Sequence, residues 1–158
     1  MTADKILTPA QLPAVLAQWQ AAGRRVVFTN GCFDLLHLGH VDYLEKARAL
    51  GDALVVGLNT DASVSGLKPG RPLQDEYARA RILASLAFVD AVVLFGEPTP
   101  AHLIALVQPD VLVKGDDYAP EAIVGYDTVT AKGGTVQTVP LVPGYSTSRI
   151  VEKILRFG

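Results

Sequence analysis

The chain has 158 residues, of which 49% are hydrophobic and 19% charged, and its formal net charge at pH 7 is −2. These values suit a folded chain long enough for one domain with a buried core, and they exclude an intrinsically disordered one. Because there is no basic excess, nucleic acid is not an expected partner, whereas a small phosphorylated ligand needs only a few local cations.

Along the chain, short apolar runs rich in valine alternate with helical patterns. The runs have strand length and are apolar on both faces, as expected in a parallel sheet that helices cover on both sides. Residues 66–72 and 142–145 are rich in glycine and proline and indicate flexible loops. In chain order, the predicted elements are a helix over 9–22, a strand over 25–30, a helix over 40–50, a strand over 53–59, a helix over 75–86, a strand over 91–96, a helix over 100–107, strands over 110–114 and 135–140, and a helix over 146–156.

The alternation of strands and helices predicts βαβ units. We therefore expect an α/β, Rossmann-like fold, a doubly wound parallel five-stranded sheet with helices on both faces. A single domain is expected over residues 1–158, with a helical extension over 1–23 in front of a core over 24–158. Open parallel sheets bind ligands at the carboxyl ends of their strands, so the residues after each strand are the first candidates for a site.

The cysteine count and the chain start bear on the cellular setting. Cys32 is the only cysteine, which excludes an intrachain disulfide and a cysteine-rich zinc site. Residues 1–5 lack the basic-then-apolar layout of a signal peptide. Apolar runs such as Ala53–Leu58 are far shorter than the ~18 residues of a membrane span. We expect a cytoplasmic protein with no membrane partner.

The most informative segment is Asn30–His40 (NGCFDLLHLGH), which leaves a predicted strand and enters a helix. His37 and His40 stand near a helix N-terminus, where free backbone N–H groups and the helix dipole favour an anion. The imidazoles can donate hydrogen bonds to phosphate oxygens, and Gly39 allows a nucleotide to approach the backbone closely. The combination favours a phosphate-binding site over two structural histidines beside a turn glycine.

Zinc is the other interpretation of the same histidines. His37 and His40 would supply two ligands and Asp34 a third, but His102 is the only other histidine, and catalytic zinc needs three protein ligands. We expect no metal site formed by the protein alone. The glycine-rich patterns of P-loop kinases and of dinucleotide-binding proteins are absent from the sequence.

A second candidate segment, Gly144–Arg149 (GYSTSR), opens the last predicted helix. Ser and Thr are natural N-caps, but Arg149 stands where a capping box begun by Ser146 would carry Glu or Gln. A cation at a helix N-terminus opposes the helix dipole, and a bound anion would reverse that penalty. The segment therefore indicates a second phosphate-binding position, with a capped helix and a solvated arginine as the alternative.

Three basic residues come from the 66–72 loop and the helix after it. Lys68 and Arg71 lie in the loop itself, which can close over a ligand. Arg79 lies on the following helix, and a solvated charged face is an equal explanation for it.

The segment Lys114–Tyr118 (KGDDY) follows another predicted strand. It offers a cation, a flexible glycine and the carboxylates of Asp116 and Asp117, which suit sugar hydroxyls or Mg²⁺. Two aspartates in a loop are also often solvated without any further role.

These segments together resemble the cytidylyltransferase-like nucleotidyltransferases. Their hallmark, His-x-Gly-His, matches His37–His40, and Ser146–Arg149 is similar to their second signature, a Ser/Thr-rich helix start that ends in a basic residue. The resemblance covers about residues 24–155. Within that superfamily, the stretches most like the bacterial heptose 1-phosphate adenylyltransferases are Asn59–Ser63, Leu67–Pro72 and Val113–Tyr118. In many bacteria that activity is fused to a sugar kinase, and this chain resembles the stand-alone form.

Two departures bear on the choice of substrate. Bacterial glycerol 3-phosphate cytidylyltransferases carry an arginine before the Val-Asp pair that starts a later strand. This chain has Ala87–Asp90 (AFVD) there, which weakens the CTP interpretation. By contrast, Asp116 and Asp117 stand where the heptose enzymes usually have Gly-Asp, while the glycerol enzymes carry Asp-Asp.

The resemblance implies transfer of AMP from ATP to a sugar 1-phosphate, a heptose 1-phosphate, with Mg²⁺ bound to the substrate. The products would be pyrophosphate and an ADP-sugar used for lipopolysaccharide precursors, and the protein would be a homo-oligomer, a dimer or larger. The implied catalytic residues are His37, His40 and Lys68. The implied nucleotide-binding residues are Asn30, Gly31, Cys32, Phe33, His37, Gly39, His40, Lys114, Gly144, Tyr145, Ser146, Thr147, Ser148 and Arg149. The implied acceptor-binding residues are Asp34, Lys68, Arg71, Arg79, Asp116 and Asp117. The alternatives are a cytidylyltransferase that uses CTP and glycerol 3-phosphate, and a non-catalytic nucleotide-binding module.

Overall fold

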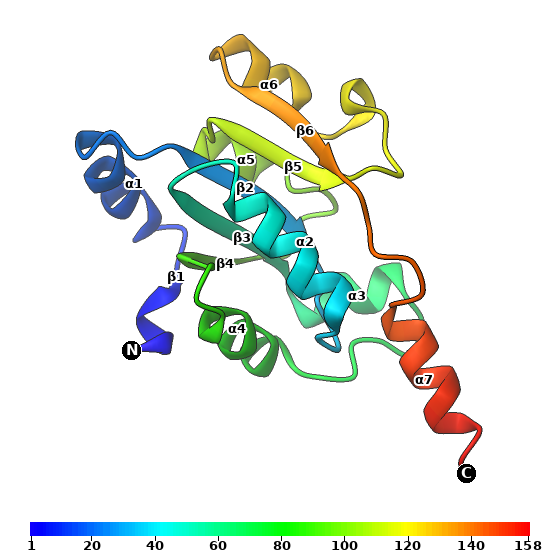
Figure 1. Cartoon of the computed structure of the whole chain (residues 1–158). Helices are drawn as coiled ribbons and strands as arrows, with labels where there is room; N and C mark the ends of the chain where they lie inside the picture. The colour runs from blue at the N-terminus through cyan, green and yellow to red at the C-terminus, as the bar shows by residue number, and fades with distance from the viewer.

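The architecture was obtained as a computed structural model that describes every residue from Met1 to Gly158. Its centre is a parallel sheet of six strands in the order β1-β4-β3-β2-β5-β6 (Figure 1). The strands are β1 (Ile6–Leu7), β2 (Val26–Gly31), β3 (Ala53–Asn59), β4 (Ala91–Phe95), β5 (Val111–Gly115) and β6 (Thr135–Val139).

The five longer strands lie within one residue of their predicted bounds. Every residue of β3 is buried, and β2 pairs with it over its whole length, from Val26 opposite Ala53 to Gly31 opposite Leu58. Residues that alternate along β3 point to opposite faces, so a strand apolar on both faces needs cover on both sides. The apolar run of β3 is therefore explained by helices that cover both faces of the sheet.

The predicted count of five strands is wrong, because residues 1–23 are not only helical. Within them β1 pairs with β4, Ile6 opposite Val92 and Leu7 opposite Val93, and extends the sheet by one edge strand. A short 3-10 helix precedes it, and the Lys5 ammonium donates hydrogen bonds to the carbonyls of Leu86 and Val89. Two residues are too few to give a strand signal in the sequence.

Helices connect the strands. Two of them, α3 and α6, and the short 3-10 helices were not predicted; α3 follows β3 directly and is capped by Thr60, whose side chain accepts a hydrogen bond from the Ser63 N–H. The α-helices are α1 (Leu12–Ala21), α2 (Leu38–Arg48), α3 (Asp61–Leu67), α4 (Glu76–Ser85), α5 (Ala101–Val107), α6 (Tyr126–Ala131) and α7 (Thr147–Leu155), and the 3-10 helices are η1 (Thr2–Lys5) and η2 (Pro120–Ala122).

Two separate apolar clusters cover the two faces of the sheet, as a doubly wound fold requires. On one face α2 and α4 pack Leu44 and Leu83 against strand residues such as Val56. On the other face α1, α5 and α6 contribute residues such as Leu12 and Ile104. The helices thus occupy both faces, as predicted. None of them combines the length and the apolar character that a membrane crossing requires.

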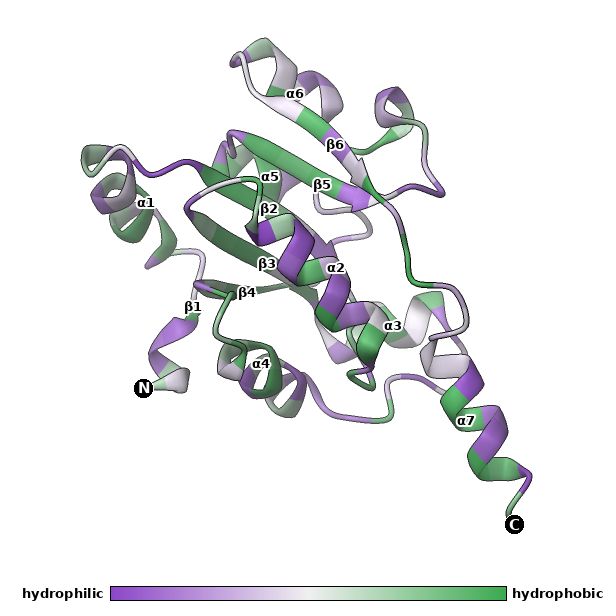
Figure 2. Ribbon diagram, viewed as in Figure 1, coloured by the Kyte–Doolittle hydropathy of each residue, from purple (hydrophilic) through white to green (hydrophobic).

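The last helix, α7, differs from the others. It contains no buried residue, and it extends away from the rest of the molecule (Figure 1). Bands of apolar and polar residues alternate along its ribbon (Figure 2). Ile154, Leu155 and Phe157 are 60%, 72% and 82% exposed.

Candidate active site

A cavity of about 720 Å³ opens at the carboxyl ends of β2 and β5. These two strands are neighbours where the strand order reverses, with β3 and β4 on one side and β6 on the other. This switch point is where open α/β sheets bind their ligands. The predicted site residues that line the cavity are Asn30, Gly31, Cys32, Phe33, Asp34, His37, Gly39, His40, Lys68, Arg71, Lys114, Asp117, Tyr145, Ser146, Thr147 and Ser148.

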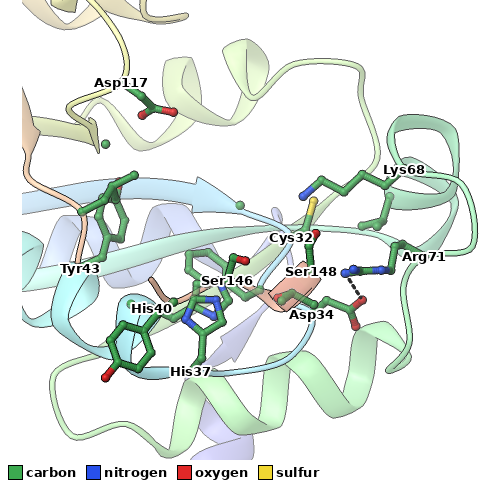
Figure 3. A pocket seen from close by; sticks show the side chains of 18 of the residues that line it. Cys32, Asp34, His37, His40, Tyr43, Lys68, Arg71, Asp117, Ser146 and Ser148 are labelled. Atoms are coloured by element: carbon green, nitrogen blue, oxygen red, sulfur yellow. Dashed lines mark hydrogen bonds and ion pairs between the residues drawn. The ribbon is translucent and has the colours of Figure 1, made fainter. Parts of the chain in front are cut away.

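His37 and His40 lie face to face in the cavity, with ring centroids 3.8 Å apart and an interplanar angle of 22° (Figure 3). His37 is the N-cap of α2, and Phe33 meets the His40 ring edge-on at 5.1 Å. A Cβ added to Gly39 would lie 3.0 Å from the His37 ring, so the glycine lets the His37 ring lie close to the backbone of α2 without having to shift.

The two stacked rings are held in their neutral form. Burial lowers the pKa of His40 to about 4, and the neighbouring His37 acts on this pKa in the same direction. Burial also lowers the pKa of His37. Two imidazolium cations in contact would repel each other, so the pair is uncharged at neutral pH.

Several polar groups at the cavity have no partner within the chain. The Nδ1 atoms of His37 and His40 and the Oδ1 atom of Asn30 are buried without a hydrogen bond. Unpaired buried polar atoms cost free energy, and a ligand that pairs with them recovers it. Burial lowers the pKa of Lys114 as well. The Lys68 side chain extends from its loop toward Cys32 (Figure 3). The cavity thus presents unpaired imidazole and amide groups beside two lysines.

Asp34 forms hydrogen bonds that hold the loop carrying Lys68 and Arg71 in place. Its carboxylate accepts hydrogen bonds from the backbone N–H groups of Leu73 at 2.9 Å and Gln74 at 3.0 Å, and it pairs with the Arg71 guanidinium at 3.4 Å (Figure 3). With these charge-assisted contacts, the carboxylate is already satisfied by the protein. Its prediction as an acceptor-binding residue fits less well than a role in holding the loop.

Arg79 does not line the cavity, although it was predicted to bind the acceptor. Its side chain is completely buried under the loop and donates hydrogen bonds to the carbonyls of Cys32 and Gln74 and to the Asp61 carboxylate. Direct contact with a ligand does not fit this arrangement. The sequence showed the charge of Arg79 but not its burial.

Three other predicted residues stand beside the cavity without lining it. Asp116 is exposed in the loop after β5. Gly144 and Arg149 belong to the start of α7, where the Arg149 guanidinium donates to the Gly144 carbonyl at 3.4 Å. The Arg149 guanidinium thus contacts its own turn and does not line the cavity.

The start of α7 closes one side of the cavity with hydroxyl groups. Ser146 is the N-cap, and its Oγ accepts a hydrogen bond from the Arg149 N–H at 3.1 Å. The Thr147 hydroxyl donates a hydrogen bond to the Leu35 carbonyl at 3.4 Å. This bond links the start of α7 to the Asn30–His40 segment. Ser148 faces the cavity as well (Figure 3).

Tyr43 is a lining residue that sequence reasoning missed. Its hydroxyl is 2.7 Å from the Thr29 Oγ1 and donates to the Val113 carbonyl at 3.1 Å, so it joins α2 to β2 and β5 under the cavity. Burial raises its pKa to about 12. By helical period Tyr43 has the position of an ordinary core residue, and its contact with Thr29, 14 residues away, is not visible in the sequence.

The sequence matches the cytidylyltransferase-like family over residues 28–153. The matched region includes both His37–His40 and Ser146–Arg149, the two segments that meet at the cavity.

The chain belongs to the cytidylyltransferase-like family. As a member of this family, it is a nucleotidyltransferase, and it has the α/β fold described above.

Similar curated proteins are longer than this chain. The bifunctional protein HldE of Azorhizobium caulinodans is 58% identical over 159 residues, which cover 96% of this chain and 33% of that protein. The bifunctional protein HldE of Citrifermentans bemidjiense is 59% identical over 153 residues, which cover 96% of this chain and 31% of that protein. The chain therefore spans about a third of the length of these relatives.

Among solved structures, the lipopolysaccharide core biosynthesis protein from Thermoplasma volcanium has a TM-score of 0.62 and 33% identity, covering 76% of this chain and 98% of that one. Pantothenate synthetase from Thermus thermophilus has a TM-score of 0.61 and 23% identity, covering 87% of this chain and 62% of that one. The second similarity shows the shared fold alone.

The site of this cytidylyltransferase-like chain contains no group of three or more His, Cys, Asp or Glu side chains able to hold a metal ion. Asp34, which the zinc interpretation would use as a third ligand, is paired with Arg71 instead.

Proposed function

We propose that this chain transfers AMP from ATP to a heptose 1-phosphate, releasing pyrophosphate and an ADP-heptose. The observation that carries the proposal is the meeting of His37, His40, Lys68 and the hydroxyls of the α7 start in one cavity at the switch point of the sheet. The choice of acceptor is supported by the resemblance to heptose 1-phosphate adenylyltransferases in the segments around Lys68 and Lys114. Similarity to a lipopolysaccharide core biosynthesis protein agrees with it.

In the proposed step, an oxygen of the acceptor phosphate attacks the α-phosphorus of ATP in line. A P–O bond forms as the bond to the bridging oxygen breaks, and the electron pair leaves with the Mg²⁺-bound pyrophosphate. No covalent enzyme intermediate is required, so Cys32 needs no nucleophilic role. Catalysis then consists of positioning the two phosphates and stabilising the charge that develops on the α-phosphate.

The roles proposed for the residues follow from their positions. His40, the deeper of the stacked rings, would donate to the α-phosphate and His37 to the phosphates beyond it. A neutral imidazole has one N–H donor and gains a second when an adjacent anion draws a proton onto it. Lys68, on its loop above Cys32, would bridge the α-phosphate and the acceptor phosphate, and Ser146–Ser148 would hold the β- and γ-phosphates.

A second candidate substrate pair is CTP with a polyol phosphate such as glycerol 3-phosphate. It is favoured by one feature, the Asp116-Asp117 pair, of which Asp117 lines the cavity. The mechanism would be the same, and only the base and the acceptor would differ.

The test is a pyrophosphate-release assay with Mg²⁺ that crosses ATP and CTP with heptose 1-phosphate and glycerol 3-phosphate. Turnover with ATP and the heptose phosphate alone is the expected result. Turnover only with CTP and the polyol phosphate would keep the chemistry and replace the substrates. Nucleotide binding without pyrophosphate from any pair would identify a non-catalytic nucleotide-binding module.

As part of the same proposal, the protein acts in the cytoplasm, where ATP is available, and it acts as a homo-oligomer. The exposed apolar residues Ile154, Leu155 and Phe157 at the end of the chain are a surface that a subunit contact would cover. Sedimentation equilibrium is expected to give a mass above the 16.8 kDa of one chain. A monomer at all accessible concentrations would contradict this part of the proposal.

A further inference from the structure

Arg79 is the largest fully buried side chain of the protein, and it joins three separate segments. Its Nη1 donates to the Cys32 carbonyl at 2.7 Å, its Nε to the Gln74 carbonyl at 3.0 Å, and its Nη2 to the Asp61 Oδ1 at 2.8 Å. Burial of a charged group costs free energy unless it is paired and hydrogen-bonded, and this guanidinium has both. Its planar fork of donors suits three fixed acceptors better than a lysine ammonium would.

The contact with Cys32 fixes the orientation of one peptide unit at the edge of the cavity. A peptide is planar and trans, so the C=O of Cys32 and the N–H of Phe33 point in opposite directions. Because Arg79 binds the carbonyl on the buried side, the Phe33 N–H is directed away from Arg79. Cys32 and Phe33 line the cavity, whereas Arg79 does not.

The backbone at Phe33 is in an unfavourable conformation. Its φ is +43°, in the left-handed region that residues other than glycine seldom adopt. Such a conformation costs on the order of 1 kcal/mol or more and persists where surrounding contacts hold it. The Phe33 N–H also makes no hydrogen bond within the chain, although its side chain is buried. A strained turn thus leaves a free donor at the cavity edge.

We infer that Arg79 is a positioning residue that turns the Cys32–Phe33 peptide so that the Phe33 N–H donates to a nucleotide phosphate. The inference rests on the proposed function, which puts the phosphates in this cavity. Through the Gln74 carbonyl, Arg79 also fixes the end of the loop that carries Lys68, and Asp34 holds that loop from the other side through the Gln74 N–H. Arg79 acts through these groups and does not touch substrate.

The test uses Arg79→Lys and Arg79→Gln, with Arg81→Gln as the matched control. Arg81 lies on the same helix, is exposed, and contacts only Tyr77 through its guanidinium. Both Arg79 variants are expected to lower kcat in the pyrophosphate assay by at least about 10²-fold, the usual effect of losing one transition-state donor. The Arg81 variant is expected to keep its kcat within about twofold, as is usual for surface substitutions.

A second measurement follows the Phe33 amide directly, first in the wild-type protein and then in a variant. In ¹⁵N-labelled wild-type protein titrated with Mg-ADP, the Phe33 amide proton is expected to shift downfield and to exchange more slowly with solvent. In a folded Arg79→Lys variant the same amide is expected to respond less. A purely structural role would lower the melting temperature and leave that response intact, so it would overturn the inference.

The outcomes separate this inference from the proposed function. Wild-type turnover together with a Phe33 amide that ignores Mg-ADP overturns the inference and leaves the function standing. Nucleotide binding without pyrophosphate release removes the proposed reaction, while the amide titration still decides the role of Arg79. If both Arg79 variants fail to fold, the amide titration is repeated in Asp61→Ala, which removes one acceptor of the Arg79 guanidinium, and an unchanged Phe33 response there would overturn the inference.

Discussion

The segments Asn30–His40 and Gly144–Arg149 both contribute residues to the cavity, but the elements that carry them are anchored very differently. The first segment runs from a central strand into α2, which buries Tyr43, Leu44 and Ala47 against the sheet. The second segment opens α7, which buries no residue. Its side-chain link to the first segment is the hydrogen bond from Thr147 to the Leu35 carbonyl.

The difference indicates how the two halves of the site contribute. Stacked histidines held by a buried helix are preorganised, which is what charge stabilisation in a transition state requires. A helix with few buried contacts opens locally at low free energy, and binding loops are often drawn from such regions. We therefore expect the stacked histidines to determine kcat, and we expect ligand binding to order the start of α7.

The largest expected difference between the halves is in stability. Leu44→Ala is expected to lower the free energy of unfolding by about 2–5 kcal/mol, because it removes a completely buried side chain of α2 and leaves a cavity. Ile154→Ala on α7 is expected to change it by less than about 0.5 kcal/mol. Urea titrations of the two variants measure both values. Equal losses would show that α7 is packed as tightly as α2.

Removal of the His40 imidazole is expected to lower kcat about 10²–10³-fold while the protein stays folded, because one preorganised donor to the α-phosphate is lost. Initial rates of pyrophosphate release, with circular dichroism as a check on folding, measure this. His102→Ala is the control, since that histidine is exposed on α5 outside the cavity. A folded His40→Ala protein with full activity would remove His40 from the mechanism.

The buried histidines also predict a pH dependence of stability. His40 is neutral in the folded state down to a pKa of about 4, whereas in the unfolded chain it takes up a proton below its ordinary pKa of 6.5. The unfolded state then binds more protons, so stability falls as the pH is lowered from about 6.5 to about 4. Relative to His40→Gln, the wild type is expected to lose about 1–2 kcal/mol by about pH 5 in urea titrations. Parallel pH profiles of the two proteins would contradict the assignment.

The smallest expected effect is on the α7 side. Ser146→Ala removes the N-cap of α7 and is expected to destabilise that helix by about 1 kcal/mol. Amide hydrogen exchange in α7 should then be about fivefold faster, while the melting temperature stays nearly unchanged. Ser146→Thr, which keeps a capping hydroxyl, is the control. Faster exchange throughout the protein, rather than in α7 alone, would mean that α7 unfolds together with the core.

Much of the fold could be predicted because its signal is local and repeated. The strands β2 to β6 come from short valine-rich runs, most of them apolar on both faces, whose length and β-branched residues favour strand over helix. The elements that were missed have little apolar pattern: β1 has two residues, and α3 (DASVSGL) combines serines and a glycine beside a loop. In these places tertiary pairing and capping, rather than sequence pattern, determine the structure.

The segments that form the site could be predicted from the sequence, whereas the contacts between their side chains could not. Residues after β2 and β5 line the cavity, because strand ends of a parallel sheet meet at one edge. The roles of Asp34 and Arg79 could not be obtained in the same way. Charge is visible in a sequence, but these two charges are buried and paired by chain segments that lie 40 and 47 residues away from them.

The stacked pair of His37 and His40 has a consequence for binding heats. Because both rings are neutral in the free protein, an approaching triphosphate raises their pKa values and draws protons from the solution. On the proposed mode of binding, ATP association near neutral pH is coupled to proton uptake. The apparent enthalpy in calorimetry would then vary with the ionisation heat of the buffer, and its slope would count the protons taken up.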